Sequence, residues 1–147
     1  MKMQELKNVN ITALFSVPFN HLLISQGDIV KLFTTGDPQK DIFNFVEAPG
    51  IKIALFPNQK KEVVFENARL VVNDKSETDL SASTLISDFK KVFNSDSVDK
   101  DKVTAYGFNY DMLIELNGSK LTDLIGTKIF QLPDIKIKNA GITISRK

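Results

Sequence analysis

Residues 103–116 read VTAYGFNYDMLIEL, and this stretch decides the fold. At the two-residue period of a strand, one face carries mainly large side chains: Thr104, Tyr106, Phe108, Tyr110, Met112, Ile114 and Leu116. The opposite face is mostly small or polar. A helix would distribute the aromatic side chains around its circumference, so the pattern favours a strand. Its expected length of about 46 Å exceeds that of most strands, which predicts a bend or bulge at Gly107.

Residues 80–94 predict the one main helix of the chain. Their apolar side chains recur at helical spacing and form a single stripe: Leu85, Ile86, Phe89, Val92 and Phe93. Asp79 or Ser81 is expected to cap the N-terminus of this helix. The stripe and the aromatic face of residues 103–116 are expected to meet in the core.

Short β-rich runs separated by turn residues predict an antiparallel meander over residues 42–72. The runs are expected at 42–47, 51–56, 62–65 and 69–72. Asp37 and Pro38 also fit a helix start, but the alternating Phe43 and Phe45 favour a strand there. The predicted fold class is therefore α+β, an antiparallel, meander-rich sheet with the helix 80–94 packed on one face.

The two ends of the chain are less regular. Residues 9–16 fit a strand that lies at a sheet edge or ends early, because Pro18 follows. Gln26-Gly27 suits a turn between two apolar runs, 20–24 and 29–34, that fit either a strand or a helix. Near the C-terminus, residues 135–145 alternate around a loop that ends in glycine, which predicts a hairpin.

A length of 147 residues suits a single domain, 1–147, with its own core, although the sequence can also be a fragment of a longer chain. The chain has no cysteine and one histidine, which excludes disulfides and the usual zinc sites within one chain. Polar residues stand where a secretory signal needs an apolar run, and no stretch suits a membrane helix. A cytoplasmic location without membrane contact is expected, and export by a route without a signal peptide or a place in a virus particle stays open.

The net charge of +1 is unevenly distributed. Residues 117–147 hold six basic and two acidic residues, a balance of +4, and the remaining 13 basic and 16 acidic residues give −3. This asymmetry is too mild to favour a nucleic-acid partner. A weak binder of anionic ligands or nucleic acid stays as an alternative, through the C-terminal basic residues Lys136, Lys138, Arg146 and Lys147.

No cofactor or metal is expected. Two acidic segments offer oxygen ligands: Asn73, Asp74, Ser76, Glu77 and Asp79 in one, and Asn94, Asp96, Asp99 and Asp101 in the other. Neither follows the calcium-loop pattern, and both flank the predicted helix, where these residue types form caps and turns. His21 has no metal partner in the nearby sequence, so a structural role is expected.

Asn109 and Asp111 are the weak catalytic candidates, because both project to the small face beside Gly107. With a second carboxylate, Asp111 could act as an acid or base. A solvent-exposed sheet face is the favoured interpretation, since antiparallel sheets are commonly buried on one side only. Motifs of serine hydrolases, phosphate loops and dinucleotide-binding folds are absent.

The predicted function is a non-enzymatic binding or assembly module, because catalytic motifs are absent and strand edges are expected. Its partner would be another protein or a second copy, bound through the sheet edges and the hairpin 135–145. An enzyme with a carboxylate site near Asn109 and Asp111 is the alternative.

Overall fold

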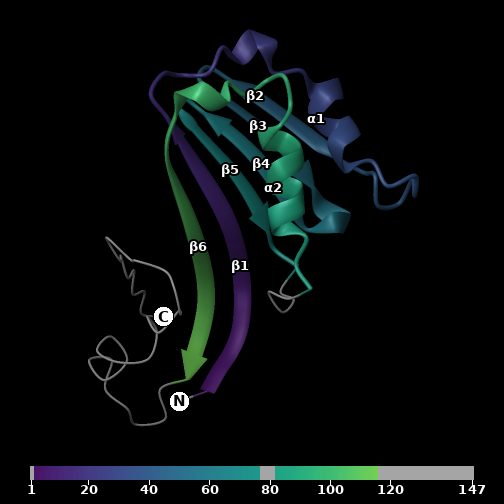
Figure 1. Cartoon of the computed structure of the whole chain (residues 1–147). Helices are drawn as coiled ribbons and strands as arrows, with labels where there is room; N and C mark the ends of the chain where they lie inside the picture. The colour runs from purple at the N-terminus through teal and green to yellow at the C-terminus, as the bar shows by residue number, and fades with distance from the viewer. Residues whose placement is uncertain (1, 77–81, 116–147) are drawn as a thin grey trace. The chain divides into compact units, whose positions relative to one another are not determined.

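Six strands form one antiparallel sheet within residues 2–76 and 82–115, the part of the chain that this computed structural model describes (Figure 1). The strands are β1 (Lys2–Phe15), β2 (Asn44–Ala48), β3 (Ile51–Phe56), β4 (Lys61–Glu66), β5 (Arg69–Asp74) and β6 (Val103–Glu115). They lie side by side in the order β2-β3-β4-β5-β1-β6. The predicted α+β fold with an antiparallel sheet is confirmed.

The chain divides into two compact units. One consists of residues 3–113, and the other of residues 1–2 together with residues 114–147. The second unit lies almost entirely outside the described residues. The same holds for the predicted hairpin 135–145 and for the C-terminal basic residues Lys136, Lys138, Arg146 and Lys147. The expectation of a single domain over 1–147 stays a prediction.

Strands β2 to β5 form the predicted meander, and each begins and ends within two residues of its expected position. Gly50 joins β2 to β3 with a φ of +75°, the left-handed value that a type II turn needs after Pro49. Asn67 makes the turn from β4 to β5, and its backbone N–H donates to the Gly50 carbonyl at 2.8 Å. The turn residues therefore set the strand boundaries here.

Strand β1 lies inside the sheet, between β5 and β6. An edge position was one of the two expectations for this strand, and it is wrong. The strand ends at Phe15, before Pro18, which agrees with the other expectation. Since Pro18 lies outside the paired residues, its missing N–H removes no hydrogen bond from the sheet.

Two helices, α1 (Gln26–Phe33) and α2 (Leu85–Phe93), cover the same face of the sheet (Figure 1). Gln26-Gly27 was predicted to be a turn, but these residues begin α1. The reason is the cap at Ser25, whose Oγ accepts a hydrogen bond from the Asp28 N–H at 3.3 Å. Short 3-10 turns complete the described structure at His21–Leu23, Pro57–Gln59 and Lys100–Lys102.

Helix α2 is shorter than the predicted helix 80–94. Residues 82–84 are not helical, because the Ser83 hydroxyl accepts from the Leu85 N–H at 3.1 Å and donates to Asp74 at 2.5 Å. The cap candidates Asp79 and Ser81 lie outside the described residues.

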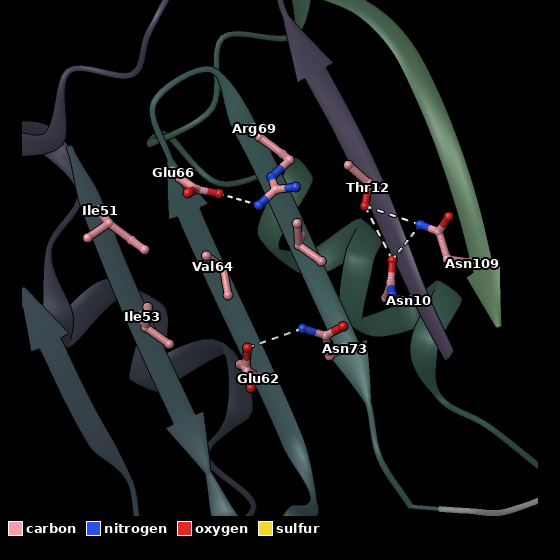
Figure 2. Close-up of a pocket in the computed structure, with 11 residues that line it drawn as sticks. Asn10, Thr12, Ile51, Ile53, Glu62, Val64, Glu66, Arg69, Asn73 and Asn109 are labelled. Carbon is pink, nitrogen blue, oxygen red and sulfur yellow. Dashed lines mark hydrogen bonds and ion pairs between the residues drawn. The ribbon is translucent and has the colours of Figure 1, made fainter. Parts of the chain in front are cut away.

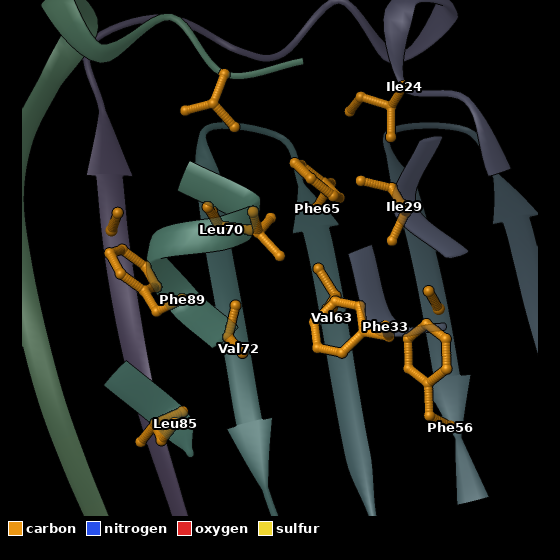
Figure 3. Packing of buried hydrophobic residues seen from close by; sticks show 14 of the residues in the cluster. Ile24, Ile29, Phe33, Phe56, Val63, Phe65, Leu70, Val72, Leu85 and Phe89 are labelled. Carbon is orange, nitrogen blue, oxygen red and sulfur yellow. The ribbon is translucent and has the colours of Figure 1, made fainter. Parts of the chain in front are cut away.

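The core lies between the helices and the sheet (Figure 3). Its buried side chains come from both layers: Val9, Ala13, Phe15, Ile24, Ile29, Phe33, Ala54, Phe56, Val63, Phe65, Leu70, Val72, Leu85, Phe89, Val92 and Val98. Leu85, Phe89 and Val92 of the predicted stripe are thus confirmed as core. The prediction that Ile86 belongs to the core is wrong, because 59 % of its surface is exposed. It lies about 100° around the helix from Leu85, beyond the face that meets the sheet.

The aromatic face of β6 was predicted to be core beneath the helix, and this is wrong. Tyr106, Phe108 and Tyr110 are exposed by 60 %, 42 % and 39 %. Helix α2 packs on β5, whereas β6 is two strands further out. Only Tyr106 reaches α2, with its ring edge toward Phe89 and Phe93 at centroid distances of 6.3 and 5.8 Å.

Strand β6 continues through Gly107 to Glu115. The φ of Gly107 is not positive, so a bulge with a left-handed glycine is absent at this position. The long strand β6 bends gradually instead, and β1 follows the same curve beside it (Figure 1).

Replacing Phe89 with alanine should lower the free energy of unfolding by about 3–5 kcal/mol, since the ring is 8 % exposed and its loss leaves a cavity. Urea denaturation followed by circular dichroism measures this. Ile86→Ala on the exposed side of α2 is the matched control, with an expected change within about 0.5 kcal/mol. A loss below about 1 kcal/mol for Phe89→Ala would contradict the packing of α2 on the sheet.

Candidate functional site

The sheet face opposite the helices is uncovered in the described structure and holds a shallow groove of about 430 Å³ (Figure 2). Its apolar floor consists of Ile51, Ile53, Val64 and Val71. Polar side chains surround the floor: Asn10, Thr12, Glu62, Glu66, Arg69, Asn73 and Asn109. An open surface with an apolar centre and a polar rim resembles a protein-contact surface more than a pocket that encloses a small molecule.

Amide side chains connect β1 to β6 along one side of this groove (Figure 2). The Asn109 amide donates to Asn10 Oδ1 at 2.8 Å and to Thr12 Oγ1 at 3.5 Å. Further along, the Asn8 amide donates to Asp111 Oδ2 at 3.0 Å. These bonds are those of an antiparallel pair. Asn109 bonds to Asn10 and Thr12, whereas Asp111, two residues later on β6, bonds to Asn8, an earlier residue of β1.

The catalytic candidates Asn109 and Asp111 lie on the same face, as their spacing requires. Both are exposed and form cross-strand hydrogen bonds. Gly107 lies on the same face, close to Asn109. A Cβ at this position would lie 4.0 Å from the Thr12 Cβ, which is ordinary contact, so neighbouring described residues do not require a glycine here.

Among the described strands, β2 and β6 are the outermost two of the sheet. Strand β2 is five residues long, and Glu47 on it forms an ion pair with Lys52 of β3. Strand β6 has 13 residues and contains no lysine, arginine or proline. Natural sheets commonly block their edges with short strands, charges or prolines. Strand β2 is thus short and charged, whereas β6 is long and has no charged residue between Val103 and Tyr110.

An exposed aromatic row accompanies the β6 edge. Phe108 and Tyr110 contact each other with ring centroids 4.7 Å apart, and Tyr106 continues the row toward α2. Together these rings form an exposed aromatic surface on the strand that is outermost among the described residues. The sequence showed the row itself, but it could not show that the strand lies outermost in the sheet.

A buried polar cluster joins α2 to the end of the sheet. Asp88 is 1 % exposed and forms ion pairs with Lys61 at 2.6 Å and with Lys91 at 3.4 Å. It also accepts a hydrogen bond from the Thr84 hydroxyl at 2.7 Å. Since every polar group has a partner within the fold, the cluster holds the helix in place and has no group free for a ligand. The sequence gives no indication of this cluster, because a single aspartate in a helix carries no sign of burial.

Asp74 lies directly opposite Lys61 in the β4–β5 pairing. Burial raises the pKa of its carboxyl group, but hydrogen bonds from Ser76 and Ser83 and the charge of Lys61 outweigh this effect, and the pKa lies below its usual value. In the loop after α1, hydrogen bonds from the backbone and hydroxyl of Thr35 and the N–H of Gly36 likewise lower the pKa of Asp41. Both carboxylates stabilise local structure.

His21 packs its ring against Phe19, with centroids 6.3 Å apart. Both ring nitrogens are buried, and neither has a hydrogen-bond partner among the described residues. Within the same residues, no group of three histidine, aspartate or glutamate side chains is placed to hold a metal ion. The absence of a metal or cofactor stays a prediction for the whole chain.

The second acidic segment forms a turn. The Asp99 side chain accepts from the Asp101 N–H at 3.1 Å and caps a 3-10 turn. The capping role expected for this segment is therefore observed at Asp99. The first segment is described only as far as Ser76.

Neither described helix has the length and apolar character of a membrane span. No family model matches the sequence, and neither the curated proteins nor the solved structures contain a match.

Asp74→Asn should reduce the loss of stability in acid. A folded-state pKa below 3.8 means that ionised Asp74 stabilises the fold above about pH 4, and that this contribution disappears as the pH falls through the folded pKa. Urea unfolding between about pH 2 and pH 6 should give a steeper fall for the wild type than for the variant. If the free energy of unfolding fell equally steeply with pH in both proteins, this assignment would be contradicted. Both proteins should keep some acid dependence, because the pKa of Asp41 is also lowered.

Calcium should not bind specifically at either acidic segment. Asp74 and Asp99 already accept backbone and hydroxyl hydrogen bonds, and these would have to break. Isothermal calorimetry with calcium chloride should show no site tighter than about 10⁻⁵ M, the weak end of sensor sites. A tighter site that Asp99→Asn abolishes would overturn the capping role.

Proposed function

We propose that this chain is a non-enzymatic binding or assembly module that acts through protein–protein contacts along the free edge of β6. The observation that carries the proposal is a 13-residue outer strand without lysine, arginine or proline, beside an exposed aromatic row. Unpaired amides and carbonyls along such an edge accept the backbone of another strand.

The length of β6 supports strand pairing as the mode of contact. At about 3.3 Å per residue the strand spans about 43 Å, long enough for a partner strand of ordinary length to pair completely. Backbone hydrogen bonds would supply affinity, and the side chains of Tyr106, Phe108 and Tyr110 would supply specificity. Aromatic residues are enriched at the centres of protein interfaces.

The uncovered groove supports the same function. It extends from β3 to β6, and its apolar floor is continuous with the polar row that ends at Asn109. A partner paired with β6 would lie beside this surface and could contact it. The groove therefore enlarges the area available to a protein that binds at the edge.

The enzymatic alternative lacks a comparable observation. Asp111 and Asn109 stand on an exposed strand and form hydrogen bonds with β1. Catalysis by a carboxylate generally needs a site that excludes water and positions a second group. The alternative that uses Lys136, Lys138, Arg146 and Lys147 concerns residues outside those described.

A photo-crosslinking amino acid at Phe108 should capture a protein partner in the cells that make this chain. The position is 42 % exposed on the β6 edge, and Val46 on the β2 edge, 45 % exposed, is the matched control. Mass spectrometry of the cross-linked peptides should identify the same partner from independent samples at Phe108 and a much weaker signal at Val46. Equal signals at both positions, or none at Phe108, would contradict the proposal.

A further inference from the structure

We propose that the partner at the β6 edge is a second copy of this chain, paired β6 to β6 in antiparallel orientation about a two-fold axis at Phe108. The inference rests on the proposed function, since it assigns an occupant to the same edge. It predicts a symmetric dimer in which two sheets become one and the helices of both copies lie on the same side.

The aromatic row is symmetric about Phe108. Tyr106 and Tyr110 stand two residues before and after it, on the same face of β6. Antiparallel pairing about Phe108 would place Tyr106 opposite Tyr110 of the second copy, and the two Phe108 rings opposite each other. Aromatic pairs opposite each other on neighbouring strands stabilise a sheet. The exposed row would thus be covered by its own counterpart.

The other face of β6 also fits this axis. Gly107 would face Asn109 of the second copy, and Ala105 would face Asp111, so each larger polar side chain meets a small one. An axis at Tyr110 would leave one aromatic pairing, that of the two Tyr110 rings. An axis at Asp111 would place two carboxylates opposite each other, which is destabilising. Phe108 is therefore the axis position that pairs the rings and separates the charges.

In the described part of the fold, the first residues of β1 and the end of β6 extend beyond β5 as a two-stranded segment, which a second copy could support. Strand β5 pairs with β1 only from Val9 to Leu14, while β1 begins at Lys2 and continues beside β6 (Figure 1). Two strands alone are marginally stable in water. With the axis at Phe108, residues 108–113 of each copy would lie beside residues 103–108 of the other, where that copy's sheet is six strands wide.

The size of the contact predicts a reversible dimer. Paired residues 103–113 give an edge about 36 Å long and about 10 Å thick, so the two copies together would bury under about 1,000 Å², the range of weak associations. The dimer should therefore form and dissociate with protein concentration.

A charge introduced at Phe108, the axis position, tests the inference. Sedimentation velocity of the full chain over a range of concentrations should show a monomer–dimer equilibrium. Phe108→Lys and Phe108→Glu should each weaken dimerisation about tenfold or more, because each places like charges opposite each other at the axis. An equal mixture of the two variants should recover dimers, since Lys then faces Glu. Val46→Lys on the β2 edge is the control and should dimerise like the wild type, and circular dichroism should give the same spectrum for all variants.

A wild type that stays monomeric at the highest attainable concentration would overturn the inference. So would a dimer that Val46→Lys breaks, or one that both Phe108 variants leave intact. If the wild type is monomeric and Phe108 still cross-links to a different protein, only the second copy is excluded and the proposed function stands. If both experiments fail, the proposed function fails with the inference.

Discussion

The ion pair between Asp88 and Lys61 joins α2 to the sheet. It attaches α2 to β4 through a buried aspartate, 2 % exposed, and a lysine that is 16 % exposed. Removing one partner of such a buried pair typically costs about 3–5 kcal/mol, because the other charge is left uncompensated. The helix is thereby held over the middle of the sheet, while β1 and β6 extend outward from it.

The exposed surface of β6 follows from this placement. A helix of nine residues is about 14 Å long, whereas β6 spans about 43 Å. Tyr106 lies at the flank of α2, and Phe108 and Tyr110 contact each other beyond it. Three large rings thus stand on the outermost described strand, which contains no lysine, arginine or proline and whose acidic residues, Asp111 and Glu115, lie in its second half. Natural sheets rarely leave such an edge unprotected, which is why we interpret it as a contact surface.

Sequence reasoning succeeded where the decisive signal is local. Gly50 and Asn67 mark the turns of the meander, and the helical spacing of Leu85, Phe89 and Val92 identifies the buried side of α2. Local signals could not reveal strand order, so β1 was thought a possible edge strand and the rings of β6 were assigned to the core. A two-residue period distinguishes the faces of a strand but not whether a helix lies above one of them.

The candidate surface was predictable only in part. The sequence identified the row of Tyr106, Phe108 and Tyr110 and placed Asn109 on the opposite face. The lack of lysine and proline in β6 becomes informative only once that strand is known to lie outermost. The buried role of Asp88 likewise depends on Lys61, 27 residues earlier in the chain, and such a long-range pairing has no signature in the sequence.

Hydrogen exchange of the β6 backbone tests the central claim most directly, because it reports on the edge amides themselves. The full chain is labelled at low and at high protein concentration, and residues 103–113 are compared with the edge strand Asn44–Ala48. We expect protection of residues 103–113 to increase with concentration while that of β2 stays constant. Exchange in 103–113 that is equally fast at every concentration would contradict the account, as would protection that is already complete at the lowest concentration.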